Sequence, residues 1–268
     1  MQEKEIILNK KKFFYREEGE GPAVVLLHGF AEKGSIWKQQ FGFFSGYRLL
    51  IPDLPGSGGS EAIEDMSMVG LARTIHDYLE RLSVKKIILI GHSMGGYITL
   101  AFAEKYADQL AGFGLFHSTA YADSEEKKQT RKKGIRFIEE HGAYEFLKIS
   151  IPNLYSPITK NRHPEIIEEQ IDGSHNFSAH SLVSYYESMI RRPDRTQVLK
   201  TTILPVLFIL GKHDGAVPLS DGLELCRVPG ISYIHILEQS AHMGMKEEPL
   251  ESNQALINYI HSIYHQTP

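Results

Sequence analysis

Strand-length apolar runs alternate with segments of helical periodicity along most of this 268-residue chain. The runs lie at residues 23–27, 47–51, 85–90, 110–116, 206–210 and 232–237. Runs that are apolar on both faces are typical of buried strands in a parallel sheet. Between two of them, residues 66–82 place apolar side chains at spacings of three and one, which predicts an amphipathic helix. This alternation predicts an α/β fold with a mostly parallel sheet flanked by helices.

The N-terminal residues depart from this alternation. Residues 5–8 and 12–16 have the composition of two short strands joined by Asn9 and Lys10, which predicts an antiparallel hairpin. With the hairpin included, we expect an eight-stranded sheet. Further helices are expected at residues 35–43, 219–225 and 249–264.

The pattern changes again between residues 119 and 197. Buried strand-like runs disappear there, and charged helical stretches replace them. Acidic residues in Asp123–Glu126 lie where the first of these helices would begin, as the helix dipole favours. We therefore expect an inserted helical cap at residues 119–197, with residues 1–118 and 198–268 forming one core domain.

Composition excludes several classes of partner. A formal net charge of −4 gives no reason to expect binding to nucleic acid. No apolar run approaches the roughly 18 residues of a membrane span, and the charged N-terminus lacks the apolar segment of a secretory signal. The single cysteine, Cys226, excludes an internal disulfide and fits a reducing compartment. We expect a cytoplasmic protein that acts on a small molecule and binds neither nucleic acid nor a membrane.

The segment Gly91-His92-Ser93-Met94-Gly95-Gly96 lies between a predicted strand and a helical stretch at residues 97–104. A serine with glycine two positions before and after it, in this context, matches the G-x-S-x-G nucleophile elbow. The turn is too sharp for side chains at the flanking glycines, and it would leave Ser93 strained with its hydroxyl exposed. The backbone N–H of Met94, at the start of the helix, would point to where an oxyanion could form.

Candidate partners for Ser93 follow other predicted strands. His28-Gly29-Phe30, Gly211–Asp214 and Ser240–His242 each come directly after one. Because sites in open parallel sheets lie beyond the carboxyl ends of the strands, these loops can converge despite their separation in sequence. The chain order serine, aspartate, histidine is that of one hydrolase architecture and differs from the two protease orders.

With these motifs the chain resembles the α/β-hydrolase fold superfamily, as a serine hydrolase with a helical cap between the sixth and seventh strands. The resemblance covers nearly the whole chain. It rests on His28–Phe30, Asp53–Gly58, Gly91–Gly96, Gly211–Asp214 and Ala241–His242.

The resemblance implies a role for each candidate residue. Ser93 would be the nucleophile, and His242 would act first as general base and then as general acid. Asp214 would hold the imidazole tautomer and stabilise its charged form. The backbone N–H groups of Phe30 and Met94 would form the oxyanion hole. No metal ion and no cofactor is expected.

Other histidines compete for the role of base. The alternatives are His213, His235, His261 and His265. Only His242 lies in a turn just after the last strand, which favours it. His28 is expected to order the oxyanion loop, and the elbow is expected to turn the side chain of His92 away from the site.

The acid also has competitors. Asp53 lies at a strand end, but the family pattern makes it a loop-organising residue. Some relatives carry the acid after the sixth strand, where this chain has Phe116-His117-Ser118 and no carboxylate before Asp123. Asp214 is therefore favoured. His117 is a departure from the family pattern that could face the pocket or serve a structural role.

A serine at the elbow argues against epoxide hydrolases and haloalkane dehalogenases of this fold, which use aspartate there. We expect hydrolysis of a small or medium carboxylic ester through an acyl-enzyme, with the cap selecting the substrate. Two alternatives remain open. One is carbon–carbon bond hydrolysis or perhydrolase (haloperoxidase-like) chemistry on the same triad, and the other is a small-molecule receptor that keeps the triad.

Overall fold

The computed structural model describes residues 1–265 and contains one eight-stranded sheet, ordered β1-β2-β4-β3-β5-β6-β7-β8. The strands are β1 (Gln2–Leu8), β2 (Lys11–Glu18), β3 (Ala23–Leu27), β4 (Arg48–Pro52), β5 (Ile87–His92), β6 (Leu110–Phe116), β7 (Val206–Gly211) and β8 (Ser232–Leu237). β2 pairs antiparallel with β1 and β4, and the pairs from β4 through β8 are parallel. The predicted α/β fold with a mostly parallel eight-stranded sheet is confirmed.

The N-terminal hairpin turns where the sequence predicts. Asn9 and Lys10 adopt φ angles of 47° and 67°, and Leu8 pairs with Lys11 across the turn. Two consecutive left-handed residues match the twist of the flanking strands, which is why such turns close hairpins.

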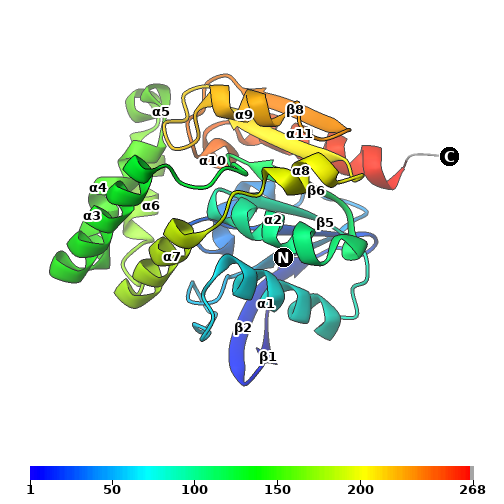
Figure 1. The fold of residues 1–268 in the computed structure, drawn as a ribbon, viewed down its shortest axis with the longest axis horizontal. Coiled ribbons are helices and arrows are strands. Elements are labelled where there is room, and N and C mark those ends of the chain that lie inside the picture. Colours follow the sequence, from blue (N-terminus) through cyan, green and yellow to red (C-terminus); the bar gives the residue numbers. More distant parts are fainter. Residues whose placement is uncertain (266–268) are drawn as a thin grey trace.

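Helices cover both faces of the sheet (Figure 1). Those outside the cap region are η1 (Gly34–Gln40), α1 (Met68–Arg81), α2 (Met94–Lys105), η2 (Ala107–Gln109), α8 (Thr196–Thr201), α9 (Leu219–Leu225), α10 (Gly244–Glu247) and α11 (Pro249–Tyr264). Within residues 1–265, no helix is long and apolar enough to cross a membrane. The helix expected at residues 35–43 is instead a short 3₁₀ helix, because Phe41 is extended and Gly42 follows with a φ of 80°.

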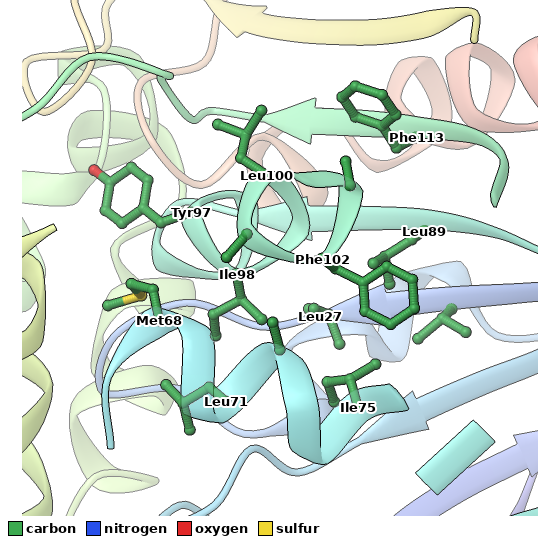
Figure 2. Packing of buried hydrophobic residues seen from close by; sticks show 14 of the residues in the cluster. Leu27, Met68, Leu71, Ile75, Leu89, Tyr97, Ile98, Leu100, Phe102 and Phe113 are labelled. Atoms are coloured by element: carbon green, nitrogen blue, oxygen red, sulfur yellow. The ribbon is translucent and has the colours of Figure 1, made fainter. Parts of the chain in front are cut away.

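Alternate side chains of the central strands pack into two separate hydrophobic cores, one on each face of the sheet. Val25 and Leu27 of β3 pack in the cluster that includes α1 and α2, whereas Val24 and Leu26 pack in the cluster that includes η1 and α11. Figure 2 shows the first cluster, in which side chains of α1 and α2 meet those of β3 and β5. The two-sided burial explains why these strands are apolar at every position.

The chain between the end of β6 and the start of β7 forms a helical segment, which lies to one side of the sheet (Figure 1). It comprises α3 (Glu125–His141), α4 (Ala143–Ser150), η3 (Ile151–Leu154), α5 (Pro157–Arg162), α6 (Pro164–Asp172) and α7 (Ala179–Arg191). The expected cap boundary at residue 197 falls inside α8, whose Leu199 is buried in the cluster with α2. The division of the chain into a core and a cap domain stays a prediction.

A buried ion cluster joins the two ends of this helical segment. Asp123, just before α3, accepts a hydrogen bond of 2.6 Å from Nε of Arg131. Its other oxygen lies 2.9 Å from Nη1 of Arg192, just after α7. Burial would raise the pKa of Asp123, but hydrogen bonds and charge from both arginines lower it below the ordinary value. The segment is therefore closed by charge pairing where it leaves and rejoins the sheet.

The close approach of β5 and α2 gives a test of the fold. A Cβ on Gly91 would lie 2.2 Å from the carbonyl carbon and oxygen of Gly95, whereas a Cβ on Gly230 would meet nothing within 4 Å. We expect Gly91→Ala to lower the free energy of unfolding by about 1–3 kcal/mol, because backbone has to move. The matched control Gly230→Ala should change it by less than about 0.5 kcal/mol. Urea denaturation measures both, and equal midpoints for the two variants would contradict this packing.

Candidate active site

The candidate residues lie at the carboxyl ends of four adjacent strands. Ser93 follows β5, His117 follows β6, Asp214 follows soon after β7, and His242 lies in the loop after β8. Because β5 to β8 are parallel neighbours, all four residues come to the same edge of the sheet.

Ser93 is held in a strained backbone conformation, with φ 51° and ψ −114°. Its N–H donates to the carbonyl of Phe116 at 2.9 Å, and its own carbonyl accepts from the N–H of Gly96 at 2.9 Å. The hydroxyl of Ser118 donates to the same carbonyl at 2.7 Å. Such a conformation costs about 1–3 kcal/mol and persists only where the surroundings fix it. These hydrogen bonds fix the elbow at the tip of β5.

His242 and Asp214 form a buried hydrogen-bonded pair. Nδ1 of His242 lies 2.8 Å from Oδ2 of Asp214. The other carboxylate oxygen accepts the N–H groups of Ala216 at 2.8 Å and Val217 at 2.9 Å. Burial would raise the pKa of Asp214, but the charge and hydrogen bond of His242, together with the neighbouring ring of His117, lower it well below its usual range. The carboxylate is therefore ionised and oriented toward the imidazole.

His117 lies against the same carboxylate. Its Nδ1 is 3.3 Å from Oδ2 of Asp214, and its Nε2 accepts the N–H of Gly244 at 3.2 Å. The side chain is fully buried, and burial lowers its pKa to about 4 despite the opposing effect of Asp214. From the sequence, His117 could face the pocket or serve a structural role. In the structure its ring is fully buried beside the Asp214–His242 pair.

A second buried carboxylate–histidine pair connects the loop after β8 to the loop after β3. Nδ1 of His92 lies 2.9 Å from Oε2 of Glu32, and its Nε2 lies 2.9 Å from the carbonyl of His242. The same Glu32 oxygen accepts the N–H of Gly29 at 2.6 Å. A carbonyl only accepts, so Nε2 of His92 carries a proton. The loop that carries His242 is thus tied back to β5, and the loop that begins with Gly29 is tied to the same histidine.

The protonation of this second pair follows from opposing effects. Burial would lower the pKa of His92, but the charge and hydrogen bond of Glu32 raise it above its ordinary value. Burial would raise the pKa of Glu32, and His92 and the Gly29 N–H lower it. The two groups therefore stabilise each other as an ion pair. Glu32 was missed from the sequence, where a lone acidic residue after the His28-Gly29-Phe30 motif carries no pattern of its own.

The two expected oxyanion donors are the backbone N–H groups of Phe30 and Met94. Within residues 1–265, neither the N–H of Phe30 nor that of Met94 donates to a protein acceptor. The ring of Phe30 stacks on Tyr186 of α7 at 4.2 Å, and Phe146 of α4 packs edge-on against Tyr186 at 5.8 Å. Aromatic side chains of the helical segment therefore cover the loop that carries one donor.

Comparison with known proteins agrees with the fold of this chain. Residues 22–133 match the family model described as the alpha/beta hydrolase fold. A thermophilic esterase from Thermogutta terrifontis, solved with malate bound, superposes with a TM-score of 0.91 at 28% identity, over 98% of this chain and 100% of that one. A 2-hydroxy-6-oxo-6-phenylhexa-2,4-dienoate hydrolase from Comamonas testosteroni is 27% identical over 92% of this chain and 90% of its own length. A monoacylglycerol lipase from Bos taurus is 24% identical over 94% of this chain and 79% of its own.

This chain has the α/β-hydrolase fold, and residues 22–133 match the model of that family. The resemblance inferred from its motifs is therefore confirmed, and so is the expectation that it is a hydrolase. The roles of individual residues in this hydrolase stay predictions.

The remaining sequence expectations concern residues beside the site. Nε2 of His28 accepts the N–H of Leu54 at 2.8 Å, and its Nδ1 lies 2.9 Å from the carbonyl of Gly29, so His28 joins the loop after β4 to the loop after β3. Asp53 accepts hydrogen bonds from the N–H groups of Gly34 at 2.7 Å and Gly59 at 2.9 Å, which organises two loops.

Five histidines were weighed as the base: His213, His235, His242, His261 and His265. Of these, the structure places only His242 in hydrogen-bond contact with Asp214. The other four lie away from this hydrogen bond. The prediction that His242 is the base of the hydrolase is consistent with this placement.

One group of side chains in residues 1–265 is close enough to hold a metal ion. It consists of His117, Asp214 and His242, with one potential ligand atom from each within 4.8 Å of the others. The ring nitrogens that face Asp214 both lie at hydrogen-bond distance from it, and that of His117 carries a proton because its Nε2 accepts the N–H of Gly244. A protonated nitrogen does not ligate a metal, so the group fits a hydrogen-bonded cluster better.

A pair of histidines at the H-x-x-x-H spacing of zinc helices was missed from the sequence. His261 lies in the last turn of α11 and His265 directly follows the helix, with ring centroids 4.9 Å apart. No third ligand accompanies them within residues 1–265. A closed metal site needs three or four protein ligands, so the pair gives no reason to expect one.

The Glu32–His92 pair predicts how stability depends on pH. Glu32→Gln keeps the hydrogen bonds but removes the charge that raises the His92 pKa above its ordinary 6.5. A raised histidine pKa stabilises the fold below the unfolded value, and this contribution is lost as pH rises through the folded value. The variant should therefore be less stable than wild type at about pH 5.5, by a margin that shrinks at about pH 8.5. Urea denaturation at both pH values tests this, and a margin independent of pH would contradict the ion pair.

Proposed function

We propose that this hydrolase cleaves a small or medium carboxylic ester through Ser93, His242 and Asp214. The observation that carries the proposal is the 2.8 Å hydrogen bond from Nδ1 of His242 to Asp214. It assigns the imidazole proton to Nδ1 and leaves Nε2 as the basic nitrogen. The strained elbow at the same sheet edge supplies the nucleophile.

The reaction then runs in two halves. In the first, Oγ of Ser93 attacks the ester carbonyl as Nε2 of His242 takes its proton, and the alcohol leaves with that proton. In the second, His242 takes a proton from water, whose oxygen attacks the acyl-enzyme; the bond from the acyl carbon to Oγ of Ser93 breaks, His242 returns the proton to Oγ, and the acid is released. Asp214 stays ionised throughout and stabilises the transient imidazolium.

The oxyanion of each tetrahedral intermediate would accept the N–H groups of Phe30 and Met94. Both groups lack protein acceptors in the described residues, so no internal bond has to break before they bind it. Preorganised donors of this kind are typically worth about 10²–10³ in rate each. Gly29, next to Phe30, is fixed by Glu32, which supports a rigid oxyanion loop.

We further propose that the helical cap selects the substrate. Phe146 and Tyr186 of this segment pack over Phe30, which would give the acyl or alcohol group an aromatic surface. The composition supports a small diffusible substrate met in the cytoplasm, without nucleic acid or membrane. The structural similarity to the T. terrifontis esterase supports an ester as the substrate class.

Ser93→Ala tests the nucleophile. We expect the variant to lose turnover of p-nitrophenyl butyrate by up to about 10⁶-fold, because the triad acts as a unit. The matched control is Ser220→Ala, which removes an exposed serine of α9 and should leave turnover unchanged. The initial rate of p-nitrophenol release measures both. Activity retained in Ser93→Ala would overturn the assignment.

Carbon–carbon bond hydrolysis is a second candidate, favoured by the similarity to the C. testosteroni dienoate hydrolase. Both reactions would use the same triad, so only the substrate distinguishes them. We expect kcat/KM for short p-nitrophenyl esters to exceed that for 2-hydroxy-6-oxo-dienoates. Parallel steady-state assays on one preparation measure the ratio, and the opposite order would assign the enzyme to carbon–carbon cleavage.

A further inference from the structure

His117 lies beside the proposed catalytic pair without a part in the proposed reaction. We infer that it is a positioning residue that shares the Asp214 carboxylate with His242 and so sets the pH range in which His242 acts as a base. This inference rests on the proposed function.

The hydrogen-bond partners of His117 determine which of its nitrogens carries the proton. The N–H of Gly244 points to Nε2 at 3.2 Å, and a backbone N–H only donates. Nε2 is therefore the acceptor, and the proton of the neutral ring is on Nδ1. Nδ1 lies 3.3 Å from Oδ2 of Asp214 but makes no hydrogen bond there, so the ring acts on the carboxylate through the dipole of a neighbouring N–H.

The surroundings of His117 are built for an imidazole. A Cβ on Gly211 would lie 2.8 Å from Cε1 of the ring, and one on Gly244 would lie 2.4 Å from Nε2. Both glycines therefore leave room that a larger residue would fill. His117 itself has a φ of 48°, a conformation that few residues other than glycine adopt without strain. This backbone conformation places the ring beside Asp214.

The two carboxylate oxygens of Asp214 have different neighbours. Oδ1 accepts two backbone N–H groups, those of Ala216 and Val217. Oδ2 faces the imidazoles of both His242 and His117. The positive end of the His117 N–H dipole, close to Oδ2, offsets part of the negative charge that would stabilise protonated His242. Removing it should make His242 easier to protonate and shift the onset of activity to higher pH.

Other titratable groups lie next to this cluster, and they are the same in wild type and in variants of His117. His92 stacks obliquely on His242 with centroids 5.0 Å apart, and Glu32 holds the far side of His92. Glu247 of α10 accepts the backbone N–H of Met243 at 3.2 Å, next to His242. His117 itself stays neutral over the working range, because burial lowers its pKa to about 4.

Two matched variants separate the donor from the bulk of the ring. His117→Asn keeps an N–H near the position of Nδ1, and asparagine tolerates positive φ. His117→Gln reaches the position of Nε2 and withdraws the donor from Asp214. We expect the acid limb of kcat/KM to move up by about 0.5–1 pH unit in His117→Gln. It should stay at the wild-type position in His117→Asn, with KM nearly unchanged in both variants.

A merely structural His117 would lower activity equally at every pH. Superimposable acid limbs for wild type and His117→Gln, or equal shifts in both variants, would overturn the inference.

Nitrogen-15 NMR of histidine-labelled protein tests His117 without relying on activity. The measurement uses Ser93→Ala, so it stands whether or not the proposed function holds. We expect one neutral histidine with its proton on Nδ1 at all pH values from about 5 to 9, whose signal is lost in His117→Gln. A proton on Nε2 of His117, or a ring that becomes charged in this range, would overturn the inference.

Discussion

A buried negative charge on Asp214 is the constraint around which this end of the sheet is built. An isolated carboxylate in a protein interior is too costly to remain ionised, so it has to be paired and hydrogen-bonded. Three donors meet this need, the N–H groups of Ala216 and Val217 and the imidazole of His242, and the ring of His117 lies beside them with Nδ1 3.3 Å from Oδ2. The adjacent parallel strands β6, β7 and β8 supply them, which only this strand order permits.

A second buried carboxylate, Glu32 in the loop after β3, is likewise paired with a histidine, at the end of the neighbouring strand β5. Glu32 pairs with His92, whose other nitrogen donates to the backbone of His242. Glu32 also holds Gly29, so the loop with the expected oxyanion donor and the loop with the expected base depend on one ion pair. Both loops are irregular backbone at the end of a sheet. The buried pair therefore provides rigidity that secondary structure does not supply.

A buried carboxylate paired with basic side chains also holds the helical segment where its two ends meet the sheet. Asp123 pairs with Arg131 and Arg192, which close the segment where it meets the sheet. Beyond this anchor the contacts with the site are aromatic, through Tyr186 on Phe30. Charge pairing therefore fixes where the segment attaches, whereas aromatic packing joins it to the loop that carries Phe30.

The sequence by itself determined the features that follow from local pattern. Buried strands are apolar at every position, the helix at Met68–Arg81 is amphipathic, and the turn at Ser93 needs glycines on both sides. Strand ends then identified Asp214 and His242, because parallel strands end at one edge. Only the tertiary structure decided what these groups touch. Glu32 lies 60 residues from its partner His92, and no local pattern marks a contact across that distance. His117 was visible as an unusual residue, but its proton could be assigned only when Gly244 and Asp214 were brought to either side of its ring.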